Sequence, residues 1–203
     1  RVLVDWLRAS EVWVGANFLF GHERSGNYSL LRSLGARYGF LTDTIEPVRY
    51  KDFIVSSTRV RGLIRGGRVD EAGALLGHHY VLEGMIETGS GRGRGQGVPT
   101  ANLRTKNELL PPDGVYATTV TIGRRILGSV TNIGIRPTFG NDGPRVVETH
   151  IFDFDADLYG KEIRLAFVQR LREERTFDDA DALRQQIDSD CANAKKLFKE
   201  ISL

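Results

Sequence analysis

A glycine-rich stretch between residues 89 and 102 carries the clearest chemical signal in the sequence. It reads GSGRGRGQGVPTAN, with a glycine at every second position from Gly89 to Gly97. Glycine adopts positive φ readily, so such a backbone can turn its N–H groups toward an anion without obstruction by side chains. Arg92 and Arg94 add positive charge. The stretch is therefore suited to holding phosphate groups.

The same stretch ends in Pro99-Thr100-Ala101-Asn102, which presents a hydroxyl and an amide oxygen two residues apart. Hard oxygen ligands suit Mg²⁺, which takes the rest of its shell from water and substrate phosphates. The loop composition is also typical of an Arg/Gly-rich linker or a nucleic-acid tether, and the PTAN ending is what favours the metal–nucleotide interpretation. A P-loop is excluded because no Gly-Lys-Ser/Thr follows the glycines.

Further motifs follow in order: DGVY at residues 113–116, NIGIRPTF at 132–139 and ETH at 148–150. Together with GRGR and GxPTAN, they resemble the riboflavin kinase module, which in bacteria usually forms the C-terminal half of a bifunctional riboflavin kinase/FMN adenylyltransferase. The resemblance covers essentially the whole chain. It implies an enzyme that uses ATP and Mg²⁺ to phosphorylate riboflavin to FMN.

The resemblance implies Glu148 as the general base. A strand through ETH would place Glu148, His150 and Phe152 on one face, but the pattern alone equally allows Glu148 to point to solvent opposite a buried face. Thr100 and Asn102 are implied at the metal. The residues implied around ATP are Gly89, Arg94, Thr100, Asn102, Ile151, Asp153 and Tyr159.

Arg172, Arg175 and Phe177 are implied at the flavin by the same resemblance. Alternatively, the two arginines are surface charges, and Phe177 is an apolar residue that packs at the start of the last helix.

The first part of the chain has a strand–helix–strand pattern over Glu11–Gly15, residues 27–38 and residues 40–45, which predicts a parallel sheet with a crossover helix. GANFLFGH at residues 15–22 and SSTRVR at 56–61 resemble the second half of an FMN adenylyltransferase module. That resemblance implies a partial nucleotide site at Asn17, Ser56, Ser57, Thr58 and Arg59.

The spacing in SSTRVR by itself favours ordinary helix capping over a phosphate site. None of the four histidines lies in an HxGH motif, which the first half of the module should carry. We therefore expect adenylyl transfer only together with a missing N-terminal half. A partial sheet would also leave an open edge and an apolar face, which favours self-association through this part.

The periodicity changes at Gly77, after a short helix over residues 68–76, so we expect a nucleotidyltransferase part over 1–77 and a riboflavin kinase part over 78–203. Short strands and then one helix predict a small, mainly antiparallel closed β-barrel with a C-terminal helix, following a partial Rossmann-like α/β remnant. The strand candidates are Tyr80–Glu87, Val115–Ile122, Arg125–Ile133, Val146–Phe154 and Ile163–Leu171.

The final helix is expected to begin at residues 176–179. Along it, Leu183, Ile187 and Cys191 recur at helical spacing, so Cys191 is interpreted as a packed apolar residue and not a nucleophile.

Composition limits the remaining possibilities. The chain has 203 residues and a formal net charge of +2, divided as 11 basic against 8 acidic side chains in residues 1–77 and 17 against 18 in residues 78–203. This balance disfavours nucleic acid as the main partner. The single cysteine and the lack of an apolar run of roughly 20 residues favour a cytoplasmic protein with small-molecule substrates and no membrane partner. The alternatives left open are a nucleic-acid-binding module that uses the Arg/Gly loop and an enzyme that acts mainly as an FMN adenylyltransferase.

Overall fold

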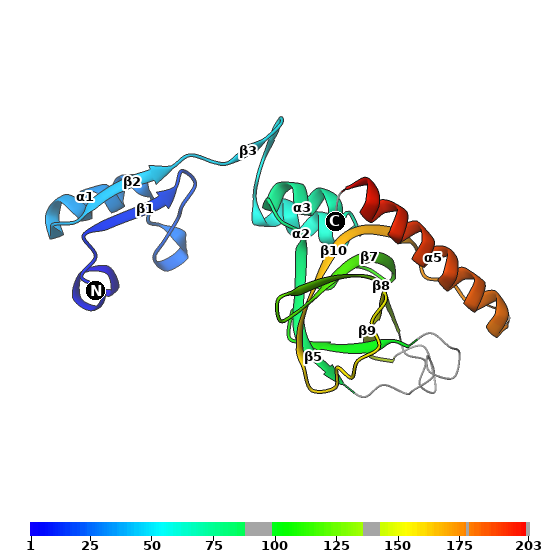
Figure 1. Cartoon of the computed structure of the whole chain (residues 1–203). Helices are drawn as coiled ribbons and strands as arrows, with labels where there is room; N and C mark the ends of the chain where they lie inside the picture. Colours follow the sequence, from blue (N-terminus) through cyan, green and yellow to red (C-terminus); the bar gives the residue numbers. More distant parts are fainter. Residues whose placement is uncertain (88–98, 136–142, 178, 202–203) are drawn as a thin grey trace. The chain divides into compact units, whose positions relative to one another are not determined.

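The computed structural model describes residues 1–87, 99–135, 143–177 and 179–201. By its contacts the chain divides into two compact units, Arg1–Val55 and Ser56–Leu203 (Figure 1). The helices that follow Ser56 belong to the second unit because they pack on its barrel. The boundary expected after residue 77 is one between two family modules, which is a different kind of division from one based on contacts. It therefore remains a prediction.

The first unit is a small α/β element. Strand β1 (Glu11–Gly15) pairs in parallel with β2 (Leu41–Ile45), and helix α1 (Tyr28–Tyr38) connects them. This confirms the predicted strand–helix–strand unit. The rest of the unit consists of the π-helical turn η1 (Val2–Trp6), the 3-10 turn η2 (His22–Arg24) and the short antiparallel pair β3 (Arg49–Tyr50) and β4 (Phe53–Ile54).

Helix α1 is bounded by local signals in the sequence. The Asn27 side chain caps its N-terminus by accepting a hydrogen bond from the Leu30 amide at 3.0 Å, and Gly39 ends it at φ 81°. Leu31 is buried with Val14 and Phe40, whereas Leu30 is 45% exposed. The helical spacing of Leu30, Leu31 and Leu34 predicts one apolar face, but a single helix on two strands buries only a narrow stripe, and Leu30 lies outside it.

Two short helices open the second unit. Helix α2 (Ser57–Arg65) is capped by Ser56, and helix α3 (Val69–Leu76) ends at Gly77 with φ 74°. Their apolar residues pack against each other, and α3 also contacts the barrel. The ending at Gly77 confirms the predicted turn, since that left-handed conformation favours glycine.

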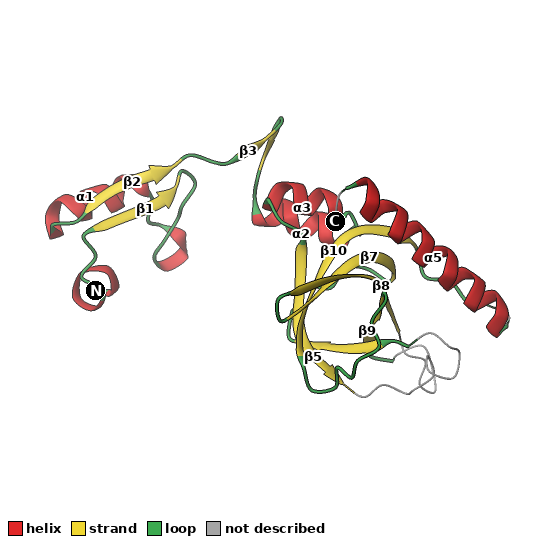
Figure 2. Cartoon of the chain, in the orientation of Figure 1, coloured by secondary structure: helices red, strands yellow, loops and turns green. Residues whose placement is uncertain are grey.

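A closed antiparallel barrel forms the core of the second unit, with strand order β10-β5-β6-β9-β8-β7 in the described part of the chain (Figure 2). It confirms the predicted barrel. Strand β6 was not among the candidates, because it begins inside PTAN, a motif that resembles a loop ending. The strands are β5 (Tyr80–Glu87), β6 (Ala101–Thr105), β7 (Gly114–Ile122), β8 (Arg125–Ile135), β9 (Arg145–Ile151) and β10 (Glu162–Arg172).

Side chains fill the barrel interior. Tyr116 and Phe167 are fully buried and meet edge to face, with ring centroids 5.3 Å apart. Beside them a row of buried hydroxyls runs from Thr118 on β7 through Thr131 on β8 to Thr149 on β9, with oxygen–oxygen distances of 2.7 and 2.9 Å. Because these side chains fill the interior, a ligand site on the described part of the barrel would lie on its outer face or at its rims.

Helix α5 (Ala180–Glu200) covers part of the outer face of the barrel (Figure 1). The Asp179 side chain caps it by accepting a hydrogen bond from the Ala182 amide at 2.7 Å. Phe198 packs with Phe152 and other outward-facing barrel residues, and Cys191 packs against the same cluster. Burial raises the pKa of the Cys191 thiol to about 11, which agrees with the packing role expected for it. Among the described helices, none is long and apolar enough to cross a membrane.

Candidate active site

The barrel register brings three polar side chains from three strands into one row. Glu148 on β9 is paired with Asn102 on β6 on one side and with Asn132 on β8 on the other. Directly opposed residues in an antiparallel sheet have Cβ atoms about 4.5–5.5 Å apart and point to the same face. The two asparagines therefore flank Glu148, although they lie 46 and 16 positions away from it in the sequence.

Alternation along β9 places Glu148 on the outer face of the barrel. Val147, Thr149 and Ile151 are buried, whereas Glu148 and His150 are half-buried. The faces agree with the alternation predicted for the ETH segment. Glu148 thus faces outward, but neighbouring groups partly cover it, so it is not simply a solvent-exposed side chain.

Thr100, the residue just before the paired part of β6, also lies next to the outer face of β9. The ladder ends with Ala101 opposite Thr149, and continuing this register by one residue puts Thr100 opposite His150. His150 Nδ1 lies 2.9 Å from the Pro99 carbonyl oxygen, which anchors this continuation. We call the resulting group of half-buried side chains the outer patch; its members are Thr100, Asn102, Asn132, Glu148 and His150.

The donor chemistry of the outer patch fits Mg²⁺. Thr100 supplies a hydroxyl oxygen and Asn102 an amide oxygen, which are hard ligands of the kind that this ion takes alongside water and phosphate. Within the described residues, no group of three or more His, Cys, Asp and Glu side chains could hold a metal. Thr100 and Asn102 together would supply two oxygen ligands, and Mg²⁺ takes the rest of its shell from water and substrate phosphates.

Glu174, which sequence reasoning did not single out, borders the outer patch. Its carboxylate forms a hydrogen bond with Asn132, and a Cβ added at Gly134 would overlap its Oε1. Burial raises the pKa of Glu174, against the lowering effect of the Asn132 hydrogen bond. The signal in the sequence is Gly134 itself, because only a residue without a side chain leaves room for this carboxylate on β8.

The structure separates the residues implied around ATP. Gly89 and Arg94 lie outside the described residues. Ile151 belongs to the barrel core, whereas Asp153 lies in the exposed turn after β9 with φ 53° and its Oδ1 is 3.9 Å from Lys195 Nζ. Of this set, the outer patch contains Thr100 and Asn102. Tyr159 is 41% exposed in the connection to β10.

Arg172 is tied to helix α5 by a buried ion pair. Its Nε lies 3.0 Å and its Nη2 2.8 Å from Asp190 Oδ2, and the side chains of Arg172 and Asp190 are 19% and 4% exposed. Gln186 Nε2 donates to the other carboxylate oxygen, Asp190 Oδ1, at 2.7 Å. Arg172 is therefore not a solvated surface charge, and most of its guanidinium is committed to α5.

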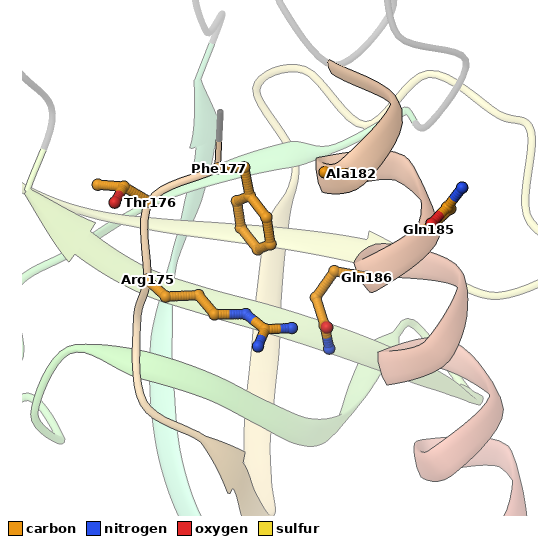
Figure 3. Close-up of a pocket in the computed structure, with 6 residues that line it drawn as sticks. All are labelled: Arg175, Thr176, Phe177, Ala182, Gln185 and Gln186. Atoms are coloured by element: carbon orange, nitrogen blue, oxygen red, sulfur yellow. The ribbon is translucent and has the colours of Figure 1, made fainter. Parts of the chain in front are cut away.

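Phe177, in the segment before α5, has two cations near its ring. The Cζ atoms of Arg172 and Arg175 are 5.8 and 5.2 Å from its ring centroid. The segment and the helix together line an open pocket of about 350 Å³, within the usual size range for small-molecule sites. Figure 3 shows Arg175 extending past the Phe177 ring toward Gln186 of α5. The lining residues are Arg175, Thr176, Phe177, Ala182, Gln185 and Gln186.

The residues implied in adenylyl transfer are divided between the two units: Asn17 belongs to the first, and residues 56–59 belong to the second. Asn17 lies in an exposed turn after the carboxyl end of β1, the edge of a parallel sheet where ligands usually bind. Ser56 caps α2 by accepting a hydrogen bond from the Arg59 amide at 3.3 Å, and its role at a nucleotide stays a prediction. Ser57 and Thr58 form the first turn of that helix.

Comparison with known families identifies the family of the chain. Residues 76–198 match the riboflavin kinase family model, and residues 1–59 match the FAD synthetase model. The first match covers more than half of the chain. The chain therefore belongs to the riboflavin kinase family.

Two bacterial relatives align with almost the whole chain. The chain is 37% identical over 197 residues to the bifunctional riboflavin kinase/FMN adenylyltransferase of Pseudomonas fluorescens, and 35% identical over 198 residues to that of Escherichia coli strain K12. Each alignment covers 97% of this chain and 63% of the relative. The chain thus spans less than two thirds of the length of these relatives.

A solved structure shares the fold. A crystal structure described as a macrolide-efflux protein from Streptococcus pneumoniae matches 96% of this chain and 64% of its own length, with a TM-score of 0.83 and 31% identity. We take from this likeness the fold alone.

Proposed function

We propose that the second unit catalyses transfer of the γ-phosphoryl group of ATP to the 5′-hydroxyl of riboflavin, which gives FMN and ADP. The observation that carries this proposal is the position of Glu148, a half-buried carboxylate flanked by Asn102 and Asn132. A base in such a position can accept a hydroxyl proton, while its neighbours supply ligands for a metal-bound nucleotide.

In the proposed reaction, Glu148 accepts the proton of the 5′-hydroxyl as that oxygen forms its bond to the γ-phosphorus. The bond between the γ-phosphorus and the bridging oxygen breaks, and ADP leaves with the electron pair. Mg²⁺ bound with the nucleotide would neutralise charge on the phosphate oxygens, and the ligands proposed for it are Thr100 and Asn102. Charge stabilisation and alignment of this kind supply most of the rate in phosphoryl transfer.

The flavin end of the reaction is proposed to lie at Phe177 and Arg175. The pocket beside them combines an aromatic ring, a cation and the amide of Gln186, a combination suited to a flat ring with polar edges. Asp190 holds Arg172 at the border of the same segment. Gly89, Arg94, Ile151, Asp153 and Tyr159 remain proposals for the ATP contacts.

A second activity is proposed for the chain as part of a bifunctional enzyme: adenylyl transfer from ATP to FMN, giving FAD. The match of residues 1–59 to the FAD synthetase model favours it. Asn17 and residues 56–59 are proposed to contact that nucleotide. We place the enzyme in the cytoplasm with small-molecule substrates, and self-association through the first unit remains part of the proposal.

The test is a pair of assays on the purified chain. With riboflavin, ATP and Mg²⁺, we expect formation of FMN and ADP in equal amounts, separated by HPLC. With FMN and ATP, the yield of FAD shows whether the chain by itself carries out the second activity, which we expect only together with the N-terminal half of the adenylyltransferase module. Lack of FMN formation by a folded protein that binds ATP would contradict the kinase proposal. Tight binding of RNA or DNA that weakens steeply with salt would instead support the nucleic-acid alternative.

A further inference from the structure

His150 connects two segments that are 51 residues apart in the sequence. Its Nδ1 lies 2.9 Å from the Pro99 carbonyl oxygen. A carbonyl oxygen only accepts hydrogen bonds, so Nδ1 must carry the proton and donate it. This bond fixes both the tautomer and the orientation of the imidazole.

The imidazole also packs against an aromatic side chain. The His150 ring meets Phe152 edge to face with centroids 6.0 Å apart, and Phe152 lies 6.3 Å from Phe198 of α5. The Lys195 ammonium lies 4.9 Å from the centroid of Phe152. The contacts with Phe152 therefore limit the rotation of His150, and the Pro99 carbonyl accepts its hydrogen bond from a ring that is held in place.

The position of this bond matters for the outer patch. Pro99 has no N–H of its own to pair with β9, and the β6–β9 ladder begins only at Ala101. Thr100 lies between these two fixed points. With the His150 bond in place, the residue before Thr100 and the residue after it are both held against β9, so the backbone of Thr100 has little freedom.

We propose that His150 is a positioning residue for phosphoryl transfer, which holds the Pro99–Asn102 segment on β9 so that Thr100 and Asn102 face the metal-bound nucleotide. This inference rests on the function proposed above. It assigns His150 no contact with substrate. Loss of the Nδ1 donor should therefore weaken ATP use while riboflavin binding stays unchanged.

Two substitutions separate the hydrogen bond from the packing. His150→Asn keeps a donor near the position of Nδ1, whereas His150→Phe keeps a ring against Phe152 but removes the donor. For His150→Phe we expect kcat/KM for ATP to fall roughly 10-fold or more, because loss of a group that orients a ligand costs about this much. For His150→Asn we expect the loss to stay within about 3-fold, since the donor is retained.

Calorimetric titration with ATP and Mg²⁺ gives a second measurement that does not depend on turnover. We expect weaker nucleotide binding in His150→Phe, recovery in His150→Asn, and the same riboflavin Kd in wild type and both variants. If His150→Phe does not fold, His150→Ala replaces it in the same comparison.

Equal ATP affinity and kcat/KM in wild type and the donor-lacking variant would overturn the proposal. So would parallel losses of ATP affinity, riboflavin affinity and Tm that His150→Asn does not recover, because those indicate a purely structural residue. If wild type makes no FMN, the kinase proposal fails, whereas the ATP titrations still decide whether His150 positions the segment.

Discussion

Arg172 on β10 and Asp190 on α5 form an ion pair in which two guanidinium nitrogens approach the same carboxylate oxygen at 3.0 and 2.8 Å. Asp190 is almost fully buried, and Gln186 from the same helix donates to its other oxygen. The pair attaches α5 to the barrel beside Phe177. It thereby links the orientation of the helix to the segment proposed to contact the flavin.

We expect Asp190→Ala to destabilise the protein strongly, by about 3–5 kcal/mol, because it leaves the Arg172 charge partly buried without its partner. Urea unfolding monitored by circular dichroism measures this loss. A change below about 1 kcal/mol would show that the pair is effectively solvated.

The double variant Arg172→Met with Asp190→Leu distinguishes stability from binding. Replacing both partners by apolar side chains is often neutral, so we expect stability close to that of wild type. If Arg172 also contacts the flavin, riboflavin affinity stays reduced in this stable variant. Normal affinity would limit Arg172 to its structural role.

Substitution of the proposed metal ligands should remove turnover without affecting the flavin site. For Thr100→Ala and for Asn102→Ala we expect FMN formation to fall by on the order of 100-fold, because each loses a group that supports charge stabilisation in the transition state. Riboflavin affinity without nucleotide should be unchanged. HPLC assays over a range of Mg²⁺ concentrations test this, and near-wild-type rates in both variants would remove the metal assignment.

Glu148→Gln keeps the shape of the side chain but cannot accept the hydroxyl proton. We expect a folded protein that binds ATP and riboflavin and transfers phosphate about 10² to 10⁴ times more slowly. Glu173→Gln is a matched control, since the Glu173 side chain is 87% exposed. An unchanged kcat, or a collapse of Tm in Glu148→Gln alone, would contradict the role as a base.

Tyr116 should make stability sensitive to alkaline pH. Burial raises the pKa of Tyr116 to about 12, and its hydroxyl donates to the Pro112 carbonyl at 2.7 Å. Because the folded pKa lies above the ordinary value of about 10, its contribution is complete below pH 10 and is lost as the pH rises toward 12.

We expect Tyr116→Phe to lose about 1 kcal/mol at pH 7, the usual contribution of one hydrogen bond, and to depend less on pH between 10 and 12. Chemical unfolding at several pH values measures both effects. The same pH dependence in wild type and variant would show that other groups cause it.

Glu174 should make the stability of the folded protein depend on pH in the acid range. Burial raises its pKa, so the unfolded chain ionises first as the pH increases, and ionised Glu174 then disfavours the folded state. Glu174→Gln resembles the protonated acid at every pH. We expect its Tm relative to wild type to be higher at pH 7 than at pH 4. A relative Tm that does not change with pH would refute this account.

Local signals in the sequence determined most of the elements. Strand β5 has the predicted bounds Tyr80–Glu87, Gly77 ends α3 as expected, and α5 begins directly after the predicted start. These features depend on alternation, caps and turn residues within a few positions. The family resemblance carried by the PTAN and ETH motifs named Asn102 and Glu148 as candidate site residues.

Only the tertiary structure decided which of these candidates lie together. Asn132 beside Glu148, the Glu174 carboxylate over Gly134, and the His150 bond to Pro99 each join segments that are far apart in the chain. Arg172 similarly has its partner on α5, a contact that neither the flavin role implied by the resemblance nor the alternative of a surface charge indicated. The register of one strand against another follows from closing and packing the whole barrel, and no local pattern contains that information.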